Sequence, residues 1–102
     1  TIHAGRYGGE EFLILFSGYT RKQAGKILEG MLTNFRNQEY DFLPEDVIIT
    51  FSAGFTYLDN KNIDVEGFIK CADEALYYSK EHGRNQITYY NDLRLRDMQV
   101  NR

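Results

Sequence analysis

Two stretches of the chain repeat apolar residues with the period of an α-helix. The first starts at Thr20 and the second starts near Asp64 and ends at Gly83. Thr20 and Gln23 have the spacing of a capping box, and glycine readily takes the left-handed conformation that ends a helix. Both stretches are therefore predicted to be amphipathic helices. Their predicted buried stripes are Ala24, Ile27, Leu28, Met31, Leu32 and Phe35 in the first, and Val65, Phe68, Ile69, Ala72, Leu76 and Ser79 in the second.

Four shorter stretches are predicted to be strands. They are residues 2–7, 11–16, 47–58 and 86–90. Gly8 and Gly9 separate the first two, and such a dipeptide readily takes the positive dihedral angles of a tight hairpin turn. The run FLILF does not alternate, which indicates a strand covered on both faces. Residues 47–58 do alternate, which predicts a strand with one core face from Val47 to Tyr57.

The predicted order of elements is β, β, α, β, α, β. This order, with long connections, indicates an α+β fold: an antiparallel-rich sheet with packed helices, resembling a ferredoxin-like layout without its beginning. The 102 residues suffice for one domain at most. The polar end, LRLRDMQVNR, is not placed by the pattern.

Composition excludes several classes of function. Twelve Lys and Arg against fifteen Asp and Glu give a net charge of -3, which argues against a nucleic-acid-binding surface, so any anion site must be local. The single cysteine, Cys71, excludes an intrachain disulfide, and no Cys/His spacing suggests zinc. No apolar run approaches the roughly 18 residues of a membrane span. We therefore expect a cytoplasmic segment without membrane contact, although the parent protein can be anchored upstream.

The stretch RYGGEEF, residues 6–12, places two carboxylates directly after two glycines at the mouth of a strand. Because glycine has no Cβ, another molecule can come against the backbone at Gly8 and Gly9. Glu10 and Glu11 offer oxygen ligands, which Mg²⁺ prefers and commonly shares with substrate phosphates. The stretch fits a nucleotide–metal site, but taken alone it is more simply an ordinary turn with solvated glutamates, because short motifs often match by chance.

A small basic cluster surrounds the predicted end of the second helix. Lys80, His82 and Arg84 lie on either side of Gly83 in an otherwise acidic chain. Two interpretations stay open: the cations complement the helix dipole and its unpaired carbonyls, or they bind phosphate. Arg84 is the better phosphate candidate because its planar guanidinium can bind two oxygens at once.

Taken together, RYGGEEF, TFSAGF and ADEALYYSKEHGRN resemble the C-terminal part of a GGDEF domain, the family of bacterial diguanylate cyclases. The similarity runs from about Arg6 to Asn91. It implies a nucleotide-cyclase palm-like fold and an enzyme that joins two GTP molecules into cyclic di-GMP and releases pyrophosphate, using Mg²⁺ or, in its place, Mn²⁺. Residues 1–91 would be the C-terminal part of this domain, and residues 92–102 a polar tail.

The resemblance also implies which residues form the site. Glu10 matches the magnesium ligand that is assigned as base for the attacking 3′-hydroxyl, and Glu11 matches the acidic position beside it. Phe12, which completes the signature, is expected to pack in the core. The residues that would contact GTP, through the turn or at its terminal phosphates, are Gly8, Gly9, Lys80 and Arg84.

The resemblance further implies partners. Each subunit holds one GTP, so a second GGDEF subunit must face the first in a homodimer, and an upstream sensory or receiver domain is expected. The family's front half, with a metal-binding aspartate and the guanine-reading residues, has no counterpart here, so we expect no synthesis by the 102 residues alone. Two alternatives remain: a degenerate module that binds a nucleotide or partner without turnover, and an α+β interaction domain with accidental motifs. The intact GGEEF favours catalysis.

Overall fold

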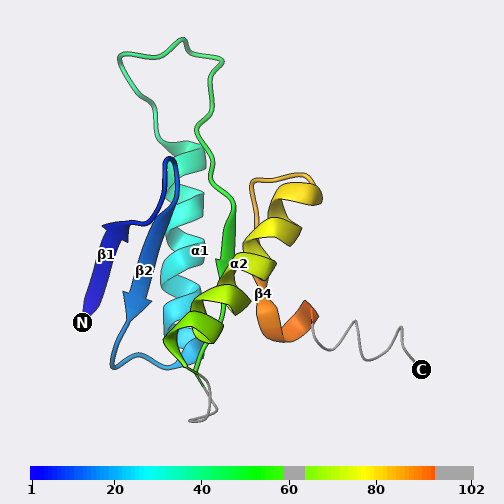
Figure 1. Ribbon diagram of the computed structural model, residues 1–102. Helices are drawn as coiled ribbons and strands as arrows, with labels where there is room; N and C mark the ends of the chain where they lie inside the picture. Colours follow the sequence, from blue (N-terminus) through cyan, green and yellow to red (C-terminus); the bar gives the residue numbers. More distant parts are fainter. Residues whose placement is uncertain (59–63, 94–102) are drawn as a thin grey trace.

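The computed structural model describes residues 1–58 and 64–93 (Figure 1). It confirms the predicted order of elements, and residues 90–93 add a helical turn after the last strand. Within the described ranges, no helix is both long and apolar enough to span a bilayer. The elements are β1 (Ile2–Arg6), β2 (Phe12–Phe16), α1 (Arg21–Asn37), β3 (Ala53–Phe55), α2 (Val65–Glu81) and β4 (Ile87–Tyr89).

Local side-chain contacts explain where the helices begin and end. The Gln23 N–H donates to Thr20 Oγ1 at 3.1 Å and the Thr20 N–H donates to Gln23 Oε1 at 2.9 Å, so the predicted capping box is present. The Gly67 N–H donates to Asp64 Oδ1 at 2.7 Å and caps α2. Gly83, with φ of 109°, follows α2 in the predicted left-handed conformation.

The strands form two separate pairs in the described part of the chain. β1 and β2 are antiparallel, with Ile2 opposite Phe16 and Arg6 opposite Phe12. β3 and β4 are parallel, and Figure 1 shows α2 crossing in front of them. The α+β class with an antiparallel hairpin and packed helices is therefore confirmed.

The core lies between α1 and the β3–β4 pair. Ala24, Leu28 and Phe55 form its buried cluster, and Leu32 is buried as well, as the helical stripe predicts. The half-buried side chains that pack against the cluster are Phe16, Met31, Phe51, Ala53, Tyr57, Ile87 and Tyr89. Phe16 thereby connects the hairpin with the rest of the molecule.

The helix α2 lies directly on β3, where Gly54 leaves no room for a side chain. A Cβ at Gly54 would overlap the carbonyl oxygen of Ala72 and the nitrogen of Leu76. Nearby, the buried Ser79 Oγ donates to the Ala53 carbonyl at 2.8 Å. Because serine has a single hydroxyl proton, the Thr88 hydroxyl must donate to Ser79 Oγ, at 2.6 Å. The end of α2 is therefore attached to both β3 and β4.

Three predictions about the hairpin are wrong. β2 is not covered on both faces, and Phe12 does not pack in the core: Phe12 is 70% exposed and Leu15 is 50% exposed. The reason is that the hairpin pairs only with itself in the described ranges and reaches the core cluster through Phe16. Neither Gly8 nor Gly9 has a positive φ, because the connection is a longer tip over residues 7–11 and not a two-residue turn.

The predicted strand over residues 47–58 shrinks to Ala53–Phe55. Its three residues are those that β4 can pair, and the residues before them form a loop that projects from the body in Figure 1. Val47 lies in this loop and is 43% exposed, contrary to the predicted core face, whereas Tyr57 packs as predicted. Val65 is also outside the core, at 73% exposed, because it is the first residue of α2.

Tyr89 gives a prediction about pH. Its hydroxyl donates to Glu29 Oε1 at 2.7 Å; burial, then this hydrogen bond, then the charges of Glu29 and Asp92 raise the pKa of Tyr89 to about 12. The folded state thus holds the proton more tightly than the unfolded state, where tyrosine titrates near pH ~10. The resulting stabilisation is complete below pH ~10 and is lost between about pH 10 and 12. When tyrosinate absorbance is titrated, the Tyr89→Phe variant should lack a tyrosine that ionises at about pH 12. If the variant instead lacks a tyrosine that ionises near pH ~10, the prediction is wrong.

Candidate functional site

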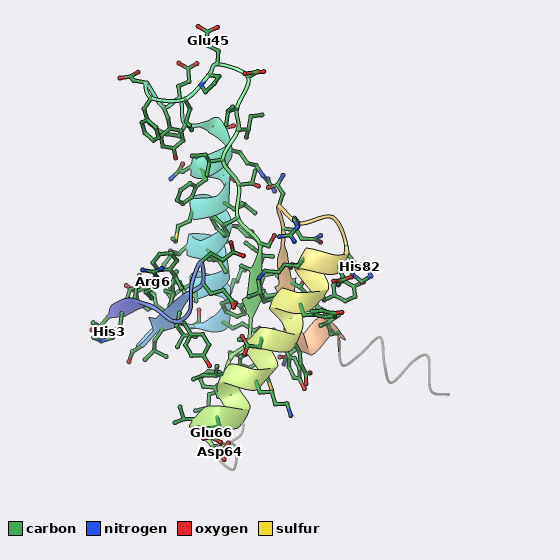
Figure 2. The ribbon with its side chains drawn as sticks, turned by 45° about the horizontal axis from the view of Figure 1, so that its top comes forward. His3, Arg6, Glu45, Asp64, Glu66 and His82 are labelled. Atoms are coloured by element: carbon green, nitrogen blue, oxygen red, sulfur yellow. The ribbon has the colours of Figure 1, made fainter. Side chains whose placement is uncertain are left out.

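The hairpin tip, residues 7–11, has a defined hydrogen-bonded shape. The N–H groups of Tyr7 and Gly8 both donate to the Glu11 carbonyl, at 2.8 and 3.3 Å. Arg6, labelled beside the hairpin in Figure 2, folds over the turn. Its guanidinium donates to the Gly9 carbonyl from Nη2 at 2.7 Å and from Nε at 3.1 Å, and to the Gly8 carbonyl at 3.4 Å. The backbone of the tip is therefore held although it is exposed.

The glycine backbone of the tip faces open space. At both Gly8 and Gly9, no atom lies within 4 Å of the position that a Cβ would occupy. A ligand can come directly against this backbone, whereas a side chain would project into the same space. The expectation that these glycines permit a close approach fits the geometry, although their conformation differs from the predicted one.

The carboxylates of Glu10 and Glu11 have different surroundings. Glu10 is exposed, and its carboxylate makes no hydrogen bond or ion pair within residues 1–58 and 64–93. Glu11 Oε2 lies 4.0 Å from Lys80 Nζ, and the two side chains are 36% and 29% exposed. An ion pair at this distance and exposure contributes at most about 1 kcal/mol. Glu10 is thus available to a cation, and Lys80 can exchange Glu11 for another anion at small cost.

The Glu11–Lys80 contact joins two segments far apart in the sequence. It brings the last turn of α2 to the hairpin tip, so that the acidic signature and a cation of the basic cluster meet. Gly8, Gly9, Glu10, Glu11 and Lys80 therefore lie in one region. Arg84 follows in the loop after α2, and its guanidinium makes no hydrogen bond or ion pair within the described ranges.

The basic cluster separates into one capping residue and two further cations. The backbone N–H of His82, labelled at the end of α2 in Figure 2, donates to the Tyr78 carbonyl at 3.0 Å. The ring Nδ1–H donates to the same carbonyl at 2.9 Å, and the ring stacks on that of Tyr78. Within the described residues, the side chains of Lys80 and Arg84 donate to no helix carbonyl. The capping interpretation fits His82, and Lys80 and Arg84 remain candidates for phosphate.

Two arginines that the sequence did not single out hold the backbone around these residues. Arg6 spans the glycine turn, as described above, and Arg36 at the end of α1 donates to Asn85 in the loop after α2. Arg6 has a local signal, because a long cationic side chain two or three residues before the glycines can reach their carbonyls. Arg36 has none, because its partner lies far along the chain.

The resemblance implies a divalent metal ion, and the hairpin tip offers some, but not all, of the ligands that such an ion needs. Residues 1–58 and 64–93 contain no group of three or more His, Cys, Asp or Glu side chains arranged to hold a metal ion. Glu10 and Glu11 nevertheless present carboxylate oxygens at an open turn. Mg²⁺ commonly takes one or two carboxylates together with waters and substrate phosphates. The tip can therefore supply part of a magnesium coordination shell.

A cavity of about 420 Å³ lies elsewhere, near the start of α1. None of the residues predicted for the site lines it, so the candidate site is the open surface at the hairpin tip. The lining residues are Arg21, Lys22, Gly25, Lys26, Glu29, Phe55, Tyr57, Tyr89, Asn91 and Asp92.

Comparisons with known proteins agree with the signature. The family described as "Diguanylate cyclase, GGDEF domain" matches residues 2–86. Diguanylate cyclase A of Treponema denticola is 31% identical over 88 residues, which cover 83% of this chain and 23% of that protein. A diguanylate cyclase of Vibrio cholerae is 31% identical over 86 residues, covering 84% and 26%. The chain thus spans about a quarter of the length of these relatives.

A solved structure extends the similarity to the fold. The crystal structure of the GGDEF domain of DgcB from Caulobacter crescentus, in complex with c-di-GMP, is similar with a TM-score of 0.78. The sequence identity is 29%, and the match covers 88% of this chain and 54% of that one. This similarity supports the predicted fold class.

Proposed function

We propose, from the premise that this chain belongs to the GGDEF family, that it carries the catalytic tip of a diguanylate cyclase. In this reaction the 3′-oxygen of one GTP attacks the α-phosphorus of the other, and the bond to pyrophosphate breaks. Two such steps give cyclic di-GMP and two pyrophosphates. The observation that carries the proposal is the Glu11–Lys80 contact, because it brings the GGEEF carboxylates and a cation from the end of α2 into one region.

Glu10 is proposed as metal ligand and as base. Its carboxylate is exposed and has no partner among the described residues, so it can accept the proton of the attacking 3′-hydroxyl, a role that needs direct access to substrate. Mg²⁺ bound at Glu10, with Mn²⁺ as a substitute, would neutralise the negative charge that develops on the α-phosphate. Glu11 beside it restrains Lys80 before substrate arrives.

The remaining residues are proposed to hold GTP. Gly8 and Gly9 allow the nucleotide to lie against the backbone of the tip, which Arg6 keeps in shape. Lys80 and Arg84 contact the terminal phosphates. Lys80 can do so by leaving its weak pair with Glu11. Cations at these phosphates stabilise the pyrophosphate as it departs.

The proposal extends to the whole protein. Residues 1–91 are proposed as the C-terminal part of the catalytic domain; the polar tail predicted for residues 92–102 lies, from residue 94 on, outside the described residues. Each domain binds one GTP, so a second copy must face it, because positioning the two nucleotides supplies much of the rate acceleration. An upstream sensory or receiver domain would control this encounter, with the catalytic domain in the cytoplasm.

A second candidate is a module that binds the nucleotide without turnover. The described residues hold no group of three metal-binding side chains, and binding needs only the glycine turn, Lys80 and Arg84. The two candidates differ in whether the complete protein converts GTP to product.

We expect Lys80→Ala and Arg84→Ala each to weaken GTP binding by about 1 to 3 kcal/mol, as for charge-assisted contacts. The measurement is calorimetry on the complete protein with Mg²⁺ and 3′-deoxy-GTP, which lacks the attacking hydroxyl. His82→Ala is the matched control, because His82 caps the same helix end. Unchanged affinity in both variants would show that these cations do not bind the phosphates.

A further inference from the structure

The loop that carries Arg84 has an unusual backbone. Gly83, Arg84 and Asn85 are consecutive residues with positive φ, at 109°, 60° and 50°. Glycine adopts this region freely and asparagine tolerates it, but for arginine it is unfavourable. Such a conformation persists only when the surrounding structure holds it. The contacts of this loop therefore determine the position of Arg84.

Part of the loop is held by the end of α2. The Arg84 N–H donates to the Ser79 carbonyl at 2.9 Å, the bond that closes a helix end of this type. The Gln86 side chain donates to the His82 carbonyl at 2.7 Å and to the Ser79 carbonyl at 3.2 Å. These contacts fix the two ends of the loop and leave Asn85 to be held from elsewhere.

Asn85 is held from two other elements. Arg36 at the end of α1 donates from Nε to Asn85 Oδ1 at 2.7 Å and from Nη2 to the Asn85 carbonyl at 2.9 Å. The Asn85 N–H donates to the hydroxyl of a second residue, Ser52 Oγ, just before β3, at 3.1 Å. Asn85 therefore makes hydrogen bonds through its side chain, its backbone carbonyl and its backbone N–H. A planar guanidinium can make this two-pronged contact, whereas the single ammonium of lysine cannot reproduce it.

We propose that Arg36 is a positioning residue for Arg84, and that its forked contact with Asn85 keeps the loop in the conformation in which Arg84 meets the terminal phosphates of GTP. This inference rests on the proposed function. Arg36 is assigned no contact with a reacting group, because its Nε and Nη2 both donate to Asn85 and direct the guanidinium to the loop. Its effect on GTP must therefore pass through the loop and depend on the presence of Arg84.

That dependence can be measured with a double-mutant cycle on the complete protein. 3′-Deoxy-GTP with Mg²⁺ is titrated into the unmodified protein, Arg36→Ala, Arg84→Ala and the double variant. Residues coupled through a shared backbone show interaction energies equivalent to about two- to 150-fold in Kd. For this indirect contact we expect the lower part of that range, about three- to tenfold. We expect Arg36→Ala to raise Kd by this factor in the unmodified background and to have no effect in the Arg84→Ala background. In turnover assays, Arg36→Ala should raise KM and also lower kcat, and neither should change in the Arg84→Ala background, because Arg84 is the residue proposed to stabilise the departing pyrophosphate.

Two further variants separate positioning from charge and from general effects. Arg36→Lys keeps the charge and loses the fork, so it should bind as weakly as Arg36→Ala. Lys22→Ala removes a cation from the same helix at its other end and should bind normally. Ser52→Ala removes the other partner of Asn85 and gives a second cycle with Arg84→Ala if Arg36→Ala fails to fold.

The outcomes distinguish the inference from the proposed function. If Arg84→Ala binds 3′-deoxy-GTP normally, Arg84 does not contact the terminal phosphates, and the inference about Arg36 is wrong as well. If Arg84→Ala binds weakly while Arg36→Ala binds normally, the inference alone is overturned. Full additivity in the double variant, or normal binding by Arg36→Lys, would also overturn it, because the effect would then not pass through the loop or would need only the charge.

Discussion

Replacing Glu10 with glutamine should abolish cyclic di-GMP synthesis by the complete protein and leave its fold unchanged. The exposed Glu10 carboxylate makes no hydrogen bond or ion pair in the described part of the chain, so the fold does not depend on its charge. An amide is a poor magnesium ligand and cannot accept the proton of the 3′-hydroxyl. Loss of a general base alone typically costs about 10²- to 10⁴-fold in rate, and loss of the metal ligand adds to this.

This result is measured by chromatographic detection of product from GTP and Mg²⁺, with thermal unfolding to verify the fold. Glu74→Gln is the matched control, because it makes the same chemical change on an exposed residue of α2 and should keep full activity. Turnover by Glu10→Gln within tenfold of the unmodified protein would refute the assignment. If the unmodified protein binds GTP but makes no product, the binding module without turnover is the correct function.

Gly54→Ala should be the most damaging small substitution in the fold, with a loss of about 3 kcal/mol or more in the free energy of unfolding. The added methyl would overlap the backbone of α2 at Ala72, Ala75 and Leu76. Backbone atoms cannot move aside by changing a rotamer, so the whole helix must shift away from β3. Because α2 carries Lys80 at its end, such a shift should also weaken GTP binding.

Urea denaturation of the two proteins measures this loss. Gly30→Ala provides a control with the opposite sign: Gly30 lies on the exposed face of α1, and nothing is within 4 Å of its Cβ position. Alanine in the interior of a helix is more favourable than glycine by about 0.5 to 1 kcal/mol, so this variant should be more stable. Equal stability of Gly54→Ala and the unmodified protein would show that α2 does not pack on β3 as described.

Much of the local structure was predictable from the sequence because it depends on neighbours in the chain. The capping box of Thr20 and Gln23 joins residues three apart, and Gly83 ends α2 through its own backbone freedom. The buried positions of Ala24, Leu28 and Leu32 follow from the helical period. The ordered match of the signature segments likewise needs no coordinates, and it led to the family that the comparisons support.

The surroundings of the site were less predictable. That Gly8, Gly9, Glu10 and Glu11 share one turn is visible in the sequence, and their chemical roles stay predictions. That Lys80 meets this turn is decided by the packing of α2 on β3, since only this packing brings the end of the helix to the hairpin. The requirement for glycine at position 54 was not predictable either. In the sequence Gly54 is a small residue in a strand, and only the structure places the backbone of α2 against it.

The wrong predictions about burial have one physical cause. An apolar run such as FLILF indicates that a strand has side chains suited to burial, but the elements that pack around the strand determine which of them are buried. In the described ranges β2 pairs only with β1, and Phe12 remains exposed. The pairing of Arg36 with Asn85 has no local signature, because two distant segments must first be brought together before their hydrogen bonds exist. The two helices and their caps depend on interactions between sequence neighbours. The extent of β3, the exposure of the hairpin, the meeting of Glu11 with Lys80 and the strained loop around Arg84 arise only from long-range packing.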